Sequence, residues 1–165
     1  MLEFRGRKRQ VMTPGRYTEL FFLDEATAQA AGHRPCAECR HTRFLDFCNA
    51  WGRAHPDSGK SARPAAQEID DRLHAERIAP ARSKRTFETA LDGQPTAYSC
   101  LCLRGAEQAF LVRSEYLLAW SPGEYSEGRR RPKVKQVRLL TPPSTVKAIQ
   151  AGYVPDLHQS ALALT

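Results

Sequence analysis

Residues 98–120 read YSCLCLRGAEQAFLVRSEYLLAW and contain three short runs that are rich in aromatic and aliphatic side chains. Turn residues separate these runs at Arg104-Gly105 and at Ser114-Glu115, and Ser121-Pro122-Gly123 follows the last run. Short β-prone runs divided by turns are typical of an antiparallel meander. A fourth run comes later in the chain, so we expect strands at residues 98–103, 109–112, 116–120 and 134–140.

Helical patterns occupy the part of the chain that precedes these strands. Asp24 is a suitable N-cap for an alanine-rich helix that Gly32 would end. A second helix is expected from Pro35 to Trp51, with Gly52 as its end. Apolar residues recur along it at helical spacing, at Cys36, Phe44, Phe47, Cys48 and Trp51.

The remaining segments complete the expected order of elements. A third helix is expected at residues 65–79, with Ile69 and Leu73 turned inward, and a last short helix at 141–151. Residues 11–23 resemble a hairpin or extended segment, and residues 153–165 are expected to be loosely held. Helices first and strands later predict an α+β fold. A helical part at residues 1–80 and a β-rich part at 81–165 are expected, and one compact domain is the alternative.

Composition restricts the class of protein. The chain has 165 residues, of which 41% are apolar and 26% charged, which is typical of a folded globular protein. Its net charge of +7 favours polyanionic partners, such as nucleic acid or an anionic membrane surface. No apolar run is long enough to cross a membrane, and the basic N-terminus is not followed by the apolar core of an export signal. An odd number of cysteines, five, favours reduced thiols or metal ligands, so we expect a cytoplasmic protein.

The most specific motif is a pair of cysteines, Cys36 and Cys39, in the sequence Gly-His-Arg-Pro-Cys-Ala-Glu-Cys-Arg. The pair follows a glycine that ends one helix and comes where the next helix is expected to begin. This spacing lets both sulfur atoms reach one tetrahedral ion, and the amino end of a helix favours thiolate over thiol. The motif therefore predicts a metal half-site, meaning two of the four ligands of a complete site.

Residues 21–40 resemble the second half of the zinc-binding knuckle of the Ada DNA-repair protein's N-terminal domain, a module that is also joined to some nucleases. The shared pattern is an aromatic strand, a short alanine-rich helix, and then Ala-Gly-aromatic-Arg-Pro-Cys-x-x-Cys, with His33 at the aromatic position. The whole chain is similar to a group of uncharacterised bacterial proteins that join such a knuckle to a β-rich part. The resemblance implies Cys36 and Cys39 as metal ligands, with zinc as the ion, and DNA or RNA as a partner.

The chain also departs from the Ada pattern. In that family an upstream cysteine pair completes a four-thiolate site, and one of that pair accepts a methyl group from DNA phosphate. No cysteine or histidine precedes His33 here, so the resemblance gives no support to methyl transfer. A start upstream of Met1 would supply the missing pair.

Several interpretations of the cysteine pair stay open. Cys100 and Cys102 would share one face of a strand and so could complete a four-thiolate site, although ordinary β-packing is favoured for them. The motif would also fit two reduced thiols without metal, or a redox pair. The remaining candidate ligands are His33, His41, Cys48, which also suits the core, and His55.

Basic residues predict contacts with phosphate. The run from Arg129 to Lys135, continued by Arg138, carries six positive charges in an expected loop and strand start, with no acidic residue among them. Such a run can neutralise phosphates and give salt-dependent binding, and a solvated hairpin loop is the alternative. Arg5, Arg7, Lys8 and Arg9 would add to the same basic face if the fold brings them together. The predicted nucleic-acid-binding residues are Arg34, Arg40, Arg129, Arg130, Arg131, Lys133 and Lys135.

A weaker pattern lies in the third expected helix. Asp70 and His74 are four residues apart and so share one helix face, which suits a carboxylate with a general base or a pair of metal ligands. An ordinary solvated face is the alternative. The leading hypothesis is a nucleic-acid-associated protein that binds through phosphate contacts. The competing hypotheses are an enzyme that uses Asp70 and His74, acting on nucleic acid or a small molecule, and a protein–protein interaction module.

Overall fold

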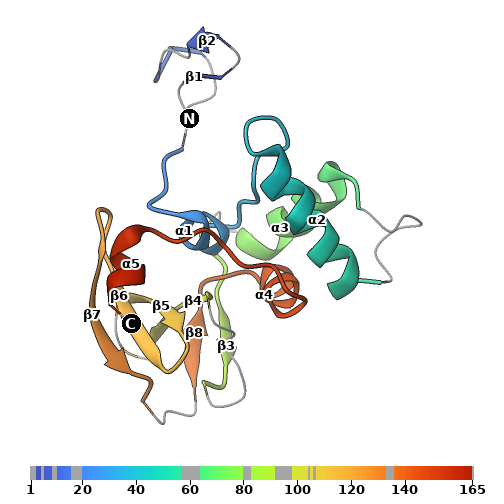
Figure 1. Cartoon of the computed structure of the whole chain (residues 1–165). Helices are drawn as coiled ribbons and strands as arrows, with labels where there is room; N and C mark the ends of the chain where they lie inside the picture. The colour runs from blue at the N-terminus through green and yellow to red at the C-terminus, as the bar shows by residue number, and fades with distance from the viewer. Residues whose placement is uncertain are drawn as a thin grey trace.

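The computed structural model describes residues 3–4, 6–8, 11–15, 20–56, 64–79, 83–91, 98–103, 105, 107–132 and 136–164. Three helices come first and a six-stranded antiparallel sheet follows, with two further helices at the end of the chain (Figure 1). The predicted α+β fold is therefore confirmed. A separate two-stranded sheet joins β1 (Glu3–Phe4) to β2 (Arg7–Lys8).

The large sheet has the strand order β3-β8-β4-β5-β6-β7, and all neighbouring strands are antiparallel. Its strands are β3 (Phe87–Thr89), β4 (Cys100–Leu103), β5 (Ala109–Arg113), β6 (Tyr116–Trp120), β7 (Tyr125–Arg130) and β8 (Val137–Leu139). The predicted meander is present from β4 onward, and β8 returns to pair with β4. Strands β3 and β7 form the two edges and were not predicted, because β3 is short and β7 is polar.

The helices are α1 (Glu25–Ala30), α2 (His41–Ala54), α3 (Ala66–Arg77), α4 (Pro143–Gln150) and α5 (Gln159–Ala163). As predicted, Asp24 caps α1, because its carboxylate accepts a hydrogen bond of 2.8 Å from the backbone amide of Thr27. Gly32 follows α1 at a φ of +80°, in the left-handed region that glycine adopts at low cost. The third expected helix is present as α3, with Ile69 and Leu73 buried.

Two predicted limits of the second helix were wrong. It begins at His41 instead of Pro35, because residues 37–40 form turns and Arg40 has a non-helical φ of −130°. It also continues past Gly52 to Ala54. The predicted apolar stripe is buried at Phe44, Phe47, Cys48 and Trp51, whereas Cys36 lies outside the helix and is exposed.

One core joins helices from both ends of the chain. Phe47 and Trp51 of α2 pack with Ile69 of α3, Ile149 of α4 and the ring of Tyr153. Each fully buried apolar side chain of this size stabilises the fold by about 1.5 to 3 kcal/mol. The helical core thus includes residues from both sides of the predicted boundary at residue 80, and the division into two parts remains a prediction.

The sheet buries both of its faces. Leu101, Phe110 and Leu117 lie on one face and pack with Val146 of α4. On the other face, Cys100, Leu111, Leu118 and Tyr125 pack against Ala26 and Ala30 of α1 and Ala161 of α5. Figure 1 shows α5 beside β7 and α1 between the sheet and the helices α2 and α3. Helix α1 therefore connects the sheet to the loop that carries the cysteine pair.

In the segment 11–23, the expected turn is present at residues 11–15, residues 20–23 form no strand, and the rest of the expected hairpin lies outside the described residues. The side chains of Leu20 and Phe21 are exposed. The prediction of a loosely held C-terminal segment was wrong. The C-terminal segment is firmly packed, because Tyr153 is buried and the backbone amide of Asp156 donates a hydrogen bond of 3.0 Å to Glu25. No described helix has the length and apolar character needed to cross a membrane.

Candidate functional site

Cys36 and Cys39 lie in the loop between α1 and α2, where Cys36 is exposed and Cys39 is partly exposed. The backbone amide of Glu38 donates a hydrogen bond of 3.4 Å to the sulfur of Cys36. Burial acts to raise the pKa of Cys36, but hydrogen bonds from Cys39 and Glu38 and the charge of Arg34 lower it overall. The pKa of Cys39 is raised by burial and by its hydrogen bond to Cys36. The thiol of Cys36 is therefore more acidic than the thiol of Cys39.

Two thiols would supply half of the ligands of a structural zinc site. A structural zinc ion takes four ligands, and the described residues contain no group of three or more side chains arranged to hold a metal ion. Cys36 and Cys39 alone therefore do not complete a structural site, and we derive no reaction through a metal.

The four-cysteine interpretation is wrong for this fold. Cys100 and Cys102 are buried in β4. The sulfur of Cys100 lies 3.8 Å from the carbonyl oxygen of Ala26, and the sulfur of Cys102 lies 3.8 Å from that of Glu107. Burial raises the pKa of Cys100 to about 12, which keeps its thiol protonated. These two residues pack within the sheet instead of joining the exposed pair.

Two of the other candidate ligands lie in the interior, whereas His41 lies at the surface beside Cys39. Cys48 is fully buried in the helical core, as its position on the apolar stripe indicated. His55 is buried against Trp51, and its Nε2 lies 3.2 Å from the carbonyl oxygen of Ser144. The Nδ1 of His41 lies 2.9 Å from the carbonyl oxygen of Ala37.

A cleft of about 410 Å³ lies beside the cysteine loop, between Gly32–Arg34 and one face of α3. Asp70 and His74 both line it, so the structure brings these two candidates to one site. Asp70 forms an ion pair of 2.7 Å with Arg34, whose guanidinium also lies 4.9 Å from the centre of the Phe44 ring. The Asp70 carboxylate is thus engaged by Arg34, and no hydrogen bond between Asp70 and His74 is present among the described side chains.

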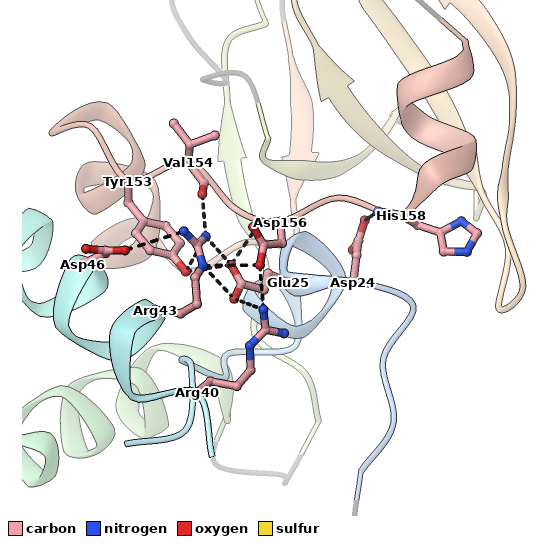
Figure 2. Close-up of polar contacts among 9 residues, drawn as sticks. All are labelled: Asp24, Glu25, Arg40, Arg43, Asp46, Tyr153, Val154, Asp156 and His158. Atoms are coloured by element: carbon pink, nitrogen blue, oxygen red, sulfur yellow. Dashed lines mark hydrogen bonds and ion pairs between the residues drawn. The ribbon is translucent and has the colours of Figure 1, made fainter. Parts of the chain in front are cut away.

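A buried polar cluster was not predicted. Glu25, only 5% exposed, accepts hydrogen bonds from Arg43 at 2.6 Å, from the hydroxyl of Tyr153 at 2.7 Å and from the amide of Asp156 at 3.0 Å. Arg40 forms an ion pair of 2.8 Å with the same carboxylate. Figure 2 shows the guanidinium of Arg43 between Glu25, the ring of Tyr153 and the carbonyl group of Val154. The cluster joins α1, α2 and the C-terminal segment.

The charges in this cluster stabilise one another. Burial acts to raise the pKa of Glu25, but the hydrogen bonds from Arg43, Asp156 and Tyr153 lower it overall. The hydrogen bond to Glu25 raises the pKa of Arg43, and burial with the same carboxylate raises the pKa of Tyr153. Arg43, Tyr153, Arg40 and the amide of Asp156 all interact with Glu25 itself. The cluster therefore holds the cysteine loop and the start of α2 in position.

The predicted phosphate-binding arginines fall into two groups. Arg34 and Arg40 form ion pairs, with Asp70 and with Glu25 and Asp156 respectively, so much of their charge is neutralised within the fold. Arg129 and Arg130 lie in the edge strand β7, and not in a loop as expected.

The β7 arginines and their neighbour Arg131 carry charge that no acid neutralises in the described part of the chain. The guanidinium of Arg129 lies 4.3 Å from the centre of the Phe110 ring, and Arg131 donates to the carbonyl oxygens of Leu91 and Ser114. Lys133 and Lys135, also predicted to bind nucleic acid, lie outside the described residues, as do Arg5 and Arg9.

Comparison with known proteins gives no family for this chain: no family model, curated protein or solved structure matches it. The resemblance of residues 21–40 to the Ada knuckle therefore remains a prediction from the residues. Three features of the described structure are candidates for a functional role, and they are the cysteine loop, the cleft and the β7 edge.

Proposed function

We propose that this protein associates with nucleic acid through contacts to backbone phosphates, and that the edge strand β7 provides the main contact. The observation that supports this most is the charge of Arg129, Arg130 and Arg131, which is not neutralised by any carboxylate in the described ranges. All residues of β7 after Tyr125 are exposed. Guanidinium groups on an open surface can pair with phosphate oxygens and release condensed counterions.

The backbone of β7 supports this interpretation. Leu118 pairs with Gly128 and Ala119 pairs with Ser126, so Glu127 is an extra residue that forms a β-bulge. Glu127 accordingly has a φ of +48°. Bulges and charged side chains at a sheet edge disfavour pairing with another strand. Helix α5 packs beside the start of β7, so the exposed arginines at the end of the strand remain for a ligand of a different kind.

Salt-dependent binding tests the proposal. Fluorescence anisotropy would measure the affinity for labelled duplex DNA, single-stranded DNA and RNA between about 50 and 200 mM salt. The double variant Arg129→Ser/Arg130→Ser removes two phosphate contacts. It should lower the slope of log affinity against log salt by about 1.8 for duplex DNA, at about 0.9 per contact.

A matched variant controls for total charge. Arg85→Ser/Lys147→Ser removes the same number of charges from exposed positions outside β7, and its slope should stay close to that of the unmodified protein. Equal slopes for both double variants, or no binding to any of the three nucleic acids at low salt, would contradict the proposal.

We propose zinc as the ion for Cys36 and Cys39, and this requires ligands beyond the pair. Elemental analysis together with thiol titration tests it, because bound zinc would protect both thiols from the titrant. Zinc that disappears in the variant Cys36→Ser/Cys39→Ser would support the assignment. A purified chain with no zinc and two freely reactive thiols would refute it.

A further inference from the structure

The cleft beside α3 has the size and lining of a site for a small polar molecule. Its volume of about 410 Å³ falls within the range of about 300 to 1,000 Å³ that is usual for small-molecule sites. Most of its lining side chains are polar or charged. They are His33, Arg34, Gln67, Asp70, Asp71, His74 and Arg77.

The two carboxylates in the cleft already have partners. Asp70 accepts a hydrogen bond of 2.7 Å from Arg34, which also donates to the carbonyl oxygen of Pro35 at 3.0 Å. Asp71 accepts a hydrogen bond of 2.7 Å from the amide of Gln67. Arg34 therefore neutralises Asp70 and forms a fixed part of the wall, whereas the amide of Gln67 holds Asp71 without cancelling its charge.

Arg77 keeps its charge. Its Nη1 lies 3.3 Å from the Nε2 of His33, and no carboxylate lies within ion-pair distance among the residues that the structure describes. Arginine has no acceptor, so His33 must accept this hydrogen bond through an unprotonated nitrogen. Burial and the charge of Arg77 lower the pKa of His33, which agrees with a neutral imidazole. A neutral partner orients the guanidinium without cancelling its charge.

Gly32 allows the loop to pack closely on the side chain of Arg77. A Cβ atom at Gly32 would lie 2.7 Å from the Cδ atom of Arg77, so the loop can pack this closely on the arginine side chain only with glycine there.

His74 lies three residues before Arg77 and therefore on the same helix face, and it is exposed in the cleft. The cleft thus presents one uncompensated guanidinium beside an accessible imidazole.

We propose that this cleft binds a phosphate monoester, with Arg77 and His74 as the contacting residues and the Arg34–Asp70 pair as a fixed wall. A phosphate monoester carries a charge of about −1.5 to −2 at pH 7 and has three acceptor oxygens, which match a guanidinium and an imidazole. The choice of phosphate over other oxyanions rests on the proposed function. The phosphate group would come either from a free nucleotide or from the end of a nucleic acid strand. The cleft is large enough to hold more of the ligand than its phosphate group.

Ligand titrations test the site directly. We would follow the imidazole resonances of His74 by NMR while adding a nucleoside monophosphate, the same nucleoside without phosphate, or inorganic phosphate. The monophosphate should shift the His74 resonances at concentrations where the nucleoside does not. Equal responses to the two compounds, or no response to either, would overturn the proposal.

Variants test the assigned contact. Arg77→Gln should weaken monophosphate binding about tenfold or more, because a hydrogen bond to a charged group is lost. The control Arg53→Gln changes an exposed arginine that is also held by a neutral acceptor, the carbonyl oxygen of Ala151, and should leave affinity unchanged. If Arg77→Gln does not fold, His74→Gln takes its place and should weaken binding several-fold. Unchanged affinity in a folded cleft variant would overturn the proposal.

Oligonucleotides with and without a 5′-phosphate distinguish the two sources and the two proposals. Tighter binding of the phosphorylated strand, abolished in the cleft variant, would support a strand end as the ligand. Equal binding of both strands, together with no response to the monophosphate, would overturn the cleft proposal and leave the β7 proposal intact. Monophosphate binding without any oligonucleotide binding would support the cleft and overturn the proposed function.

Discussion

The substitution Glu25→Gln tests whether the buried polar cluster holds the cysteine loop to the rest of the fold. Glutamine has nearly the same shape as glutamate, so the change removes the charge while leaving the packing intact. Both carboxylate oxygens are used: Oε1 faces Arg40 and the Nε of Arg43, and Oε2 faces Tyr153, Arg43 and the amide of Asp156. Whichever oxygen becomes an amide nitrogen, at least two N–H donors lose their acceptor.

The expected cost follows from these contacts. A hydrogen bond to a charged group contributes about 1.5 to 3 kcal/mol, and breaking a buried ion pair by removing one partner costs about 3 to 5 kcal/mol. Because the contacts share one carboxylate, their energies do not add. We therefore expect the free energy of unfolding to fall by about 3 to 5 kcal/mol. For a chain of this size this corresponds to a decrease in Tm of roughly 6 to 20 °C, at about 2 to 4 °C per kcal/mol.

Urea unfolding followed by tryptophan fluorescence measures this change, because Trp51 is buried in the adjoining helical core. Glu38→Gln is the matched control, since Glu38 is exposed and should change stability by no more than about 0.5 kcal/mol. A loss below about 1 kcal/mol for Glu25→Gln, with an unchanged urea dependence, would refute the structural role of the cluster.

The same cluster predicts a dependence on pH. The pKa of Glu25 is lowered in the folded state from its ordinary value of 4.5, so its charge stabilises the fold above that value. The stabilisation should be lost as the pH falls below 4.5 and through the lower folded pKa. The difference in stability between the unmodified protein and Glu25→Gln should therefore shrink in this acid range. A constant difference would contradict the assigned ionisation.

Three further outcomes are expected. Gly32→Ala should cost at least about 1 kcal/mol in thermal unfolding, because alanine is strained at a φ of +80° and its Cβ would meet Arg77; an unchanged Tm would contradict the close packing. Asp24→Ala should cost about 2 kcal/mol in urea unfolding, because it removes the cap of α1 and the acceptor of the Tyr125 hydroxyl; a cost no greater than that of an exposed substitution would contradict this. Alkylation of the folded protein after a chelator has removed any zinc, read by mass spectrometry, should modify only the exposed pair Cys36 and Cys39; early modification of the buried Cys48, Cys100 and Cys102 would contradict the fold.

Local features of the fold were predictable from the sequence because they depend on neighbouring residues. The cap at Asp24 and the left-handed glycine at Gly32 follow from side-chain and backbone chemistry within a few residues. Strand β6 was predicted with its observed limits, since its apolar run is bounded by turns on both sides. The start of α2 was not predictable in this way, because residues 37–40 are held as turns although their composition suits a helix.

Strand β7 shows where sequence patterns fail. Its residues after Tyr125 are polar and exposed, and it is a strand because it pairs with β6. The sequence identified its arginines as part of a basic run. Only the tertiary structure shows that they have no acidic partner among the described residues. Arg34 and Arg40 look equally basic in the sequence, yet the fold pairs both with carboxylates.

The sequence by itself determined that helices precede the large sheet, the cap of α1 at Asp24 and the spacing of Cys36 and Cys39, because each depends on residues that are close together in the chain. Tertiary structure alone decided the partners of Glu25, which lie 18 and 128 residues away at Arg43 and Tyr153. It also decided that Asp70 neutralises Arg34 while Arg77 keeps its charge. The reason is that an ionic partner is chosen by proximity in space, and residues distant in the chain come close only after the hydrophobic core has packed.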